Sequence, residues 1–208
     1  MILIGQYDSP FVRRVGIALR LYGMEFEHRP WSVFGDGEAI QALNPLMRVP
    51  TLVLDDGFVL TDSHMILDYL DHMANKKLVM FPRHEPARSR ALKVATLGTG
   101  LADKAVSLFF ERSQHEVTSA AWVARCTGQI NATLVALEAD RAAREGPWWF
   151  GEKISHADIT VACAWGYVAA AHKGVIDLSP YVALAAHSAA CEALPVFVEI
   201  SQAFLPPV

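Results

Sequence analysis

The chain has 208 residues, enough for one large or two small domains with a proper hydrophobic core. Apolar residues make up 52% and charged residues 19%, a composition typical of a packed globular protein that excludes a disordered one. The net charge is -4, and adjacent basic residues occur only at Arg13-Arg14 and Lys76-Lys77. This charge pattern argues against nucleic acid and anionic membranes as partners.

The cysteines and the chain's start bear on the compartment. Cys126, Cys163 and Cys191 are an odd number at wide spacing, which favours a reducing, cytoplasmic setting over a disulfide framework. The sequence has no Cys-x-x-Cys, and its histidines show no metal-ligand spacing, so we expect no metal. The chain begins without the features of a signal peptide, and its most apolar later stretch, 161–171, is too short to span a bilayer.

The first 75 residues predict a small α/β layer. Residues 2–4 form an apolar run typical of a buried strand. Ser9-Pro10 predicts the start of a helix, because Ser is a favoured N-cap and Pro is favoured at the first helical position. The other expected elements are a strand at 25–29, a short helix at 38–43, an antiparallel hairpin at 49–60 and a helix from Thr61-Asp62-Ser63 to about Met73. The order βαβ, short helix, ββα indicates a four-stranded sheet.

The rest of the chain predicts a second, helical domain. Residues 76–86 interrupt the pattern with charges and prolines, so we expect a linker there, between a domain at 1–75 and another at 87–208. Helices are expected at 87–114, 120–144, 154–172 and 181–193. The third of these is apolar nearly all round, which predicts a buried centre for the second domain. Ser155 and Asp158 predict a capping box at its start.

Ser9 is the first candidate for chemistry. Its hydroxyl stands at the positive end of a predicted helix, directly after a buried strand, and this position suits an anion. A plain N-cap is the commoner role of such a serine. The surrounding sequence is therefore needed to distinguish an anion-binding role of Ser9 from a plain N-cap role.

Four short motifs follow one another along the chain in an order that is typical of a known family. They are Ser9-Pro10-Phe11-Val12-Arg13, Asn44-Pro45-Leu46-Met47-Arg48-Val49-Pro50-Thr51-Leu52, Asp62-Ser63, and Ser155-His156-Ala157-Asp158. Together with the βαβ-ββα layer and the helical second half, they make the chain resemble the cytosolic glutathione S-transferases over essentially its whole length. The first helix resembles that of the serine-type branches (theta, zeta and many bacterial enzymes).

The resemblance implies a fold and a function. The fold would be an α/β thioredoxin-like N-terminal domain followed by an all-α C-terminal helical domain. The protein would be a cytoplasmic homodimer, with a role in detoxification. Glutathione would be its co-substrate, and the glutathione thiolate would attack an electrophilic small molecule.

The resemblance also implies roles for individual residues. Ser9 would donate its hydroxyl proton to the glutathione sulfur, with Tyr7 as the alternative because some branches use a tyrosine at the end of this strand. Five further residues would bind glutathione: Arg48 at a carboxylate, Val49 at the cysteinyl backbone next to a cis Pro50, and Asp62 with Ser63 at the γ-glutamyl end. Asp158 with Ser155 would serve folding.

Two positions depart from the family's usual pattern. Asp62 stands where Glu is usual, and it is one methylene shorter. Met47-Arg48 stands where Gly-Lys is common, and Arg48 keeps a cation there with a different reach.

Other residues have a weaker claim to a function. Phe11, Phe34, Phe109 and Trp165 are candidates for the electrophile pocket, although core packing explains most such aromatics equally well. Arg13-Arg14 is interpreted as a solvated or domain-interface face, with one of the two able to reach a substrate carboxylate.

Three other functions are alternatives to the transferase. A zeta-like enzyme would isomerise or dehalogenate a metabolite with glutathione. A non-catalytic ligand-binding or regulatory protein could use the same fold, since fold does not determine function. A glutaredoxin-like reductase is disfavoured, because residues 1–125 contain no cysteine.

Overall fold

The computed structural model describes residues 1–206 and divides into two compact units. Among the described residues, the first unit contains Met1–Met80 and Leu194–Ala203, and the second contains Phe81–Ala193 and residues 204–206. The sequence pattern placed 194–203 in the helical domain, whereas the structure joins this segment to the first unit. Within the described residues, no helix has both the length and the apolar character needed to cross a membrane.

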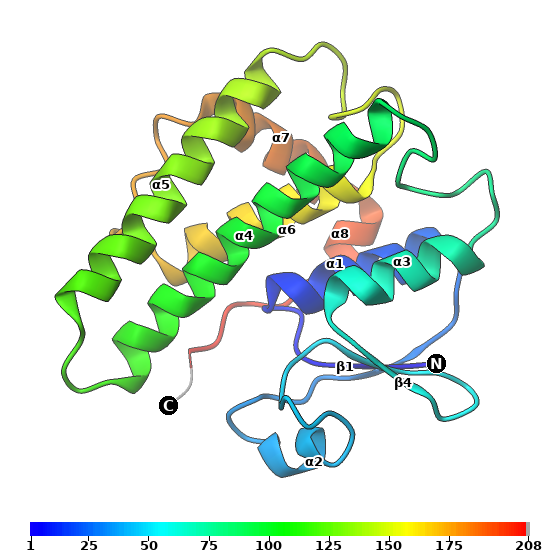
Figure 1. The fold of residues 1–208 in the computed structure, drawn as a ribbon, viewed down its shortest axis with the longest axis horizontal. Helices are drawn as coiled ribbons and strands as arrows, with labels where there is room; N and C mark the ends of the chain where they lie inside the picture. Colours follow the sequence, from blue (N-terminus) through cyan, green and yellow to red (C-terminus); the bar gives the residue numbers. More distant parts are fainter. Residues whose placement is uncertain (207–208) are drawn as a thin grey trace. The chain divides into compact units, whose positions relative to one another are not determined.

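The first unit is a four-stranded sheet with helices. Its elements are β1 (Ile2–Ile4), α1 (Pro10–Leu21), β2 (Glu27–Arg29), α2 (Gly37–Gln41), β3 (Thr51–Val53), β4 (Val59–Thr61), α3 (Ser63–Met73) and α8 (Pro195–Glu199). The strand order is β2-β1-β3-β4, with β2 parallel to β1 and both other pairings antiparallel. Helices α1 and α3 pack together on one face of the sheet, and α2 lies beyond the other face (Figure 1). This is the predicted thioredoxin-like arrangement.

The core of the first unit lies between the sheet and its two main helices. Leu3 and Leu52 are fully buried from the sheet, as are Val15 from α1 and Leu70 from α3. Burying aliphatic side chains of this size contributes about 1.5–3 kcal/mol each. This packing fixes the strands against the helices and thereby the loops at their ends.

The sheet register brings three strand ends level with one another. Ile4 at the end of β1 pairs with Thr51 at the start of β3, and Thr51 pairs with Thr61 at the end of β4. The chain that follows β1, the chain that precedes β3 and the chain that follows β4 therefore meet at one sheet edge. Helices α1 and α3 both begin at this edge.

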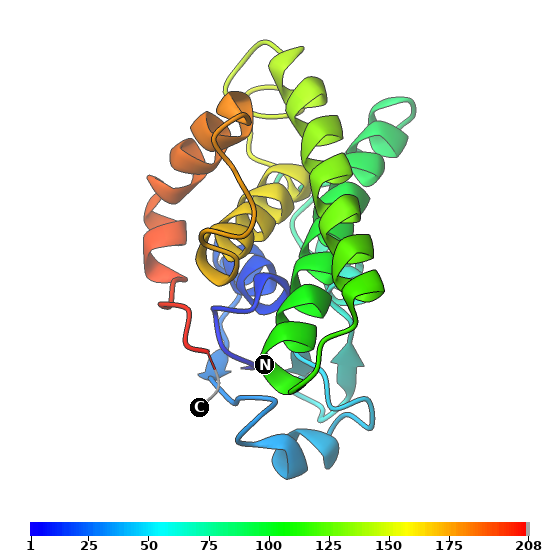
Figure 2. The same cartoon turned by 90° about the vertical axis from the view of Figure 1, so that its left-hand side faces the viewer.

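The second unit is all-helical, as predicted. It contains α4 (Ala87–Gln114), α5 (Ala120–Ala142), α6 (His156–Ala171) and α7 (Val182–Glu192). Helix α4 packs against both α5 and α6, and α6 also packs against α7 (Figure 2). The close approach of α4 and α6 depends on Gly98, since a Cβ there would lie 2.9 Å from the Thr160 methyl.

Helix α6 is the buried centre of this unit, and a carboxylate organises its start. Asp158 accepts hydrogen bonds from the Ser155 backbone N–H at 2.8 Å, from the Ser155 hydroxyl at 2.5 Å and from the Trp149 N–H at 2.7 Å. These bonds satisfy groups that a helix start otherwise leaves without partners. All three cysteines are free and buried, two of them on α6 and α7.

The C-terminal segment is attached to α1 by an arginine. The Arg13 side chain donates to the carbonyl of Ile200 at 2.8 Å and to that of Phe197 at 3.0 Å. Arg14, its neighbour, is only 1% exposed. The interpretation of this pair as a solvated face is therefore wrong, because one arginine holds the C-terminal segment and the other is buried.

Candidate functional site

Ser9 caps α1 in the way that the Ser-Pro pair predicts. Its backbone is extended, and its Oγ accepts a long 3.5 Å hydrogen bond from the Val12 N–H. Oγ therefore acts as the acceptor in this bond, which leaves the hydroxyl proton available to donate to another group. The serine is half-buried at the sheet edge where α1 begins.

The loop before β3 comes very close to the end of β1. The Val49-Pro50 peptide is cis, as the resemblance implied. A Cβ at Gly5, which has a φ of +126°, would lie 2.7 Å from the Cβ of Val49 and 2.5 Å from a methyl of Val12. Only a glycine permits this approach, so Gly5 allows Val49 to lie beside the strand that leads to Ser9.

Asn44 shapes the same loop, a role that the sequence analysis missed. Its buried amide donates to the Arg48 carbonyl at 2.9 Å and to the Thr51 hydroxyl at 3.1 Å. Its Oδ1 accepts from the Leu46 N–H at 3.0 Å. The only sequence signal is an Asn-Pro pair shortly before a strand, which indicates a turn. Arg48 itself extends an exposed side chain from this loop.

Asp62 and Ser63 form the start of α3 at the same edge. Asp62 is exposed, has a φ of +66°, and accepts a 2.8 Å hydrogen bond from the His64 N–H. Ser63 is buried, and its Oγ accepts a 2.7 Å hydrogen bond from the Arg14 guanidinium. Burial and the positive charge of Arg14 lower the pKa of His64, while Asp62 acts in the opposite direction.

The electrostatics of this edge favour a ligand with negative groups. Helices α1 and α3 both begin there, and each helix start carries N–H groups without intrahelical partners and a partial positive charge. Arg14 adds a full charge next to the second of these helix starts. The edge can therefore hold two anionic groups of one ligand, one at each helix.

Tyr7 lies in different surroundings from Ser9. Its ring stacks on His28, with 3.8 Å between the centroids, and packs against Gly16, about two turns further along α1. Burial raises the pKa of Tyr7 to about 12, although Arg20 acts in the opposite direction. The structure thus places the tyrosine ring alongside the body of α1, whereas Ser9 is at its start.

The predicted pocket aromatics occur in both units. Phe11 is half-buried on α1, and Phe34 is 43% exposed in the loop before α2. In the second unit, Phe109 of α4 meets the ring of Phe204 edge-to-face at 5.3 Å, and Trp165 is half-buried on α6. Within each unit these side chains have the partial exposure that a ligand-facing aromatic needs.

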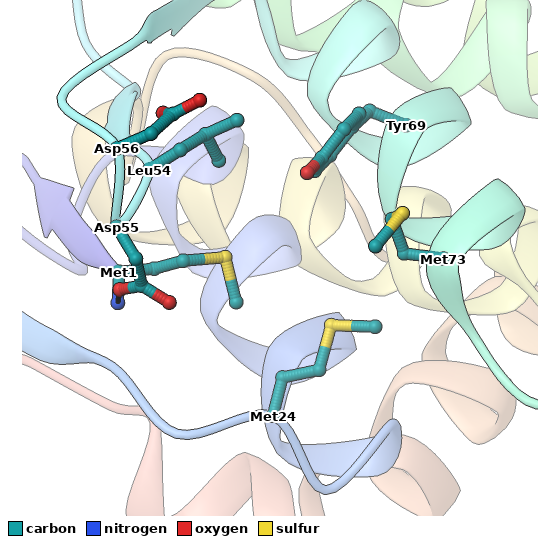
Figure 3. A pocket seen from close by; sticks show the side chains of 7 residues that line it. All are labelled: Met1, Met24, Leu54, Asp55, Asp56, Tyr69 and Met73. Carbon is teal, nitrogen blue, oxygen red and sulfur yellow. Dashed lines mark hydrogen bonds and ion pairs between the residues drawn. The ribbon is translucent and has the colours of Figure 1, made fainter.

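A hollow of about 380 Å³ lies elsewhere in the first unit. The side chains that line it are Met1, Met24, Leu54, Asp55, Asp56, Tyr69 and Met73 (Figure 3). It opens at the start of β1, whereas Ser9 follows the end of that strand. Residues 1–206 contain no group of three or more His, Cys, Asp or Glu side chains placed to hold a metal ion.

Comparison with known proteins places this geometry in a family. Residues 3–78 match the model of the glutathione S-transferase N-terminal domain, and residues 120–190 match that of the C-terminal domain. The chain is 30% identical over 172 residues to the GST-like protein YibF of Escherichia coli (strain K12), covering 81% of this chain and 82% of that protein.

Two further similarities extend over more of the chain. Maleylacetoacetate isomerase of Rattus norvegicus is 27% identical over 201 residues, which are 94% of this chain and 89% of the isomerase. A solved glutathione S-transferase from Methylobacterium radiotolerans JCM 2831, in complex with glutathione sulfonate, matches with a TM-score of 0.87 at 27% identity and covers 100% and 98% of the two chains. The chain therefore belongs to the glutathione S-transferase family.

Proposed function

We propose that this protein is a glutathione transferase in which Ser9 activates the thiol of bound glutathione. The observation that carries the proposal is the shared sheet edge, where the starts of α1 and α3 meet the loop before β3. A tripeptide with a thiol near its middle and carboxylates at its ends suits such an edge, because its thiolate would meet the start of α1 and its γ-glutamyl carboxylate the start of α3. A solved family member holds glutathione sulfonate, which supports the same ligand here.

Ser9 would act on the sulfur. A free thiol has a pKa of about 8.5, so little of it is the nucleophilic thiolate at neutral pH. A hydroxyl hydrogen bond to a charged acceptor contributes about 1.5–3 kcal/mol, and lowering a pKa by one unit needs about 1.4 kcal/mol. One hydrogen bond from Ser9, together with the helix start, is therefore sufficient to lower the thiol pKa by one to two units, roughly.

Other residues of the edge would bind the two ends of the peptide. The Val49 backbone would pair with the cysteinyl unit, as a strand pairs with its neighbour. Arg48 would meet a carboxylate at one end, and Asp62 with Ser63 would hold the γ-glutamyl group at the other. The positions of these residues at one edge support the assignment.

The surroundings of Tyr7 support Ser9 as the activating group. The Tyr7 ring packs against Gly16, about two turns along α1 from the helix start that would hold the thiolate. Ser9 has an Oγ already engaged as an acceptor by Val12, so its proton is the part left for a thiolate.

A glutathione-dependent isomerase is the second candidate, and the similarity to maleylacetoacetate isomerase favours it specifically. The same thiolate would add to a carbon of an activated cis double bond, and the former double bond would become free to rotate. Expulsion of the thiolate would then restore the double bond in the trans form and regenerate glutathione. Both reactions need the same thiolate, so the site residues are common to them.

Two assays test the proposed function. Titration calorimetry with glutathione measures binding, and turnover is followed with an activated chloroarene and, separately, with a cis-alkene dicarboxylic acid. Conjugation of the chloroarene is expected if the protein is a transferase, and trans product without glutathione consumption if it is an isomerase. Glutathione binding without either reaction would indicate a binding protein, and no glutathione binding would contradict both enzymatic proposals.

We propose a homodimer as the assembly, because the family resemblance implies one. Sedimentation at several protein concentrations measures this directly, and a monomer at all of them would contradict it.

A further inference from the structure

The C-terminal segment of the first unit, Leu194–Ala203, runs along α1. Its helix α8 packs against α1 (Figure 1), and Ile200, which follows α8, is only 2% exposed. The Arg20 guanidinium of α1 lies 2.8 Å from the Glu199 carboxylate, in addition to the hydrogen bonds that Arg13 donates to carbonyls of the segment. The segment is therefore fixed to α1 at several points.

Gly16 lets this segment and the chain before α1 share one surface of the helix. A Cβ at Gly16 would lie 3.0 Å from a methyl of Ile200 and 2.9 Å from the ring of Tyr7. Distances this short leave no room for a side chain, so both groups pack directly on the backbone of α1. The position of the C-terminal segment is therefore linked to that of Tyr7.

Two residues beyond Ile200, Gln202 reaches the backbone beside Ser9. Its Oε1 accepts a 3.1 Å hydrogen bond from the Tyr7 N–H, which lies 195 positions away in the chain. Tyr7 is inside a tight turn, since the Ser9 N–H donates to the Gln6 carbonyl at 3.2 Å. Gln202 therefore holds the middle of the turn that ends at Ser9.

The direction of the Ser9 hydroxyl depends on this turn. The bond that Oγ accepts from the Val12 N–H is long, at 3.5 Å, and such a bond fixes a side chain weakly. A hydrogen bond weakens steeply as its angle departs from linear, so a hydroxyl that donates to a sulfur needs a defined position. A displacement of the turn would therefore weaken the bond from Ser9 to a thiolate.

We propose that Gln202 is a positioning residue for glutathione activation, because its bond to the Tyr7 N–H holds the turn at 6–9 so that the Ser9 hydroxyl faces the glutathione sulfur. The side chain acts through the turn rather than by contact with the ligand. The inference rests on the proposed function, since it assumes that Ser9 donates to the thiolate. It gives the C-terminal segment a part in the chemistry beyond its packing on α1.

The test removes the acceptor oxygen and keeps the length of the side chain. Gln202→Met is nearly as long as glutamine but offers the Tyr7 N–H no oxygen. The thiolate absorbance of bound glutathione is titrated against pH in the wild type, in Gln202→Met and in Ser201→Ala, a control at an exposed position of the same segment. Gln202→Met should raise the thiol pKa by about 0.5–1 unit, since part of the Ser9 hydrogen bond is lost. Ser201→Ala should keep the wild-type value.

A double variant and a second ligand separate positioning from packing. Ser9→Ala lacks the hydroxyl, so Gln202→Met should not raise the thiol pKa further in that background. S-methylglutathione, which cannot form a thiolate, should bind to the wild type and to Gln202→Met with nearly equal affinity by calorimetry. If Gln202→Met does not fold, Gln202→Asn takes its place: it keeps the amide but is one methylene shorter, and the same rise in thiol pKa is expected.

Each outcome has a distinct meaning. An unchanged thiol pKa in the folded Gln202 variant would overturn the inference, and so would a further rise in the double variant or weaker binding of S-methylglutathione. In these cases the proposed function stands as long as Ser9→Ala returns the thiol pKa to its free value. A wild type that binds no glutathione, or an unchanged thiol pKa in Ser9→Ala, would instead overturn the proposed function.

Discussion

Met47 adopts a backbone conformation that side chains usually avoid. Its φ is +50°, in the left-handed region, and its side chain is 41% exposed. The terminal methyl lies against α2, where a Cβ at Gly37 would be 3.1 Å away. The family resemblance leads one to expect Gly at this position. The left-handed φ gives a physical reason for that Gly, because glycine adopts this region without steric cost.

Replacing Met47 with glycine is therefore expected to stabilise the protein. The variant Met47→Gly removes the steric cost of the left-handed backbone, and the expected gain in the free energy of unfolding is about 0.5–1 kcal/mol. Urea denaturation measures it. Met65→Gly is the matched control, since this exposed methionine lies in α3 and its replacement should cost about 0.5–1 kcal/mol. Destabilisation by Met47→Gly would contradict the argument.

Single residues were predictable where the signal is local. The cap at Ser9 follows from two adjacent residues, and the structure has it. The burial of Arg14 was not predictable, because its partner Ser63 is 49 positions away and a charge on an amphipathic helix ordinarily faces solvent. Asn44 was missed for a related reason, since a turn signal does not reveal which backbone groups the amide will bind.

At the scale of elements, a buried histidine joins two helices of the second unit. His172 ends α6, is 1% exposed, and its Nε2 lies 2.8 Å from the Ala105 carbonyl of α4. With a carbonyl as partner, this nitrogen is the donor. Burial lowers the pKa of His172, the bond to Ala105 acts in the opposite direction, and Arg112 lowers it further.

The lowered pKa predicts a loss of stability in acid. As the pH falls, His172 of the unfolded chain takes up a proton near pH 6.5, roughly, whereas the folded protein takes it up only at a lower pH. The contribution of the neutral His172 to the free energy of unfolding is therefore complete above that pH and is lost as the pH falls towards the folded pKa. Between pH 7.5 and 5.5, roughly, the wild type should lose up to about 1.4 kcal/mol more than His172→Gln, which keeps an N–H for the carbonyl.

Urea denaturation at the two pH values checks this prediction. His72→Gln, at an exposed position of α3, is the control and should keep the pH dependence of the wild type. Equal losses of stability in the wild type and in His172→Gln would show that this histidine does not couple folding to pH.

The long helices were predictable, and the short C-terminal one was not. Helix α4 has the predicted bounds, and α6 begins one residue after the predicted Ser155 cap, because caps and apolar periodicity are local signals. Helix α8 spans five residues and is held by Arg13 through backbone carbonyls. Every residue offers a carbonyl, so no sequence pattern marks such an attachment.

For the whole molecule, most of what the sequence predicted came from the order of its helices and strands. The order βαβ-ββα predicted the sheet, and the quoted motifs led to the family that the comparisons establish. The register that aligns Ile4, Thr51 and Thr61 is formed by pairings distant in sequence, so it became visible only in the structure. That register brings the starts of α1 and α3 to one edge, and this is the basis of the proposal that one ligand spans both helix starts.

Ser9 is proposed to lower the pKa of the glutathione thiol, and a spectroscopic titration measures this pKa. The thiolate's ultraviolet absorbance is followed against pH with glutathione bound to the wild type, to Ser9→Ala and to Tyr7→Phe. The wild type and Tyr7→Phe should show a thiol pKa about one to two units below the free value of roughly 8.5, and Ser9→Ala should return it close to that value. An equally lowered thiol pKa in Ser9→Ala would contradict the role of Ser9 in activating glutathione.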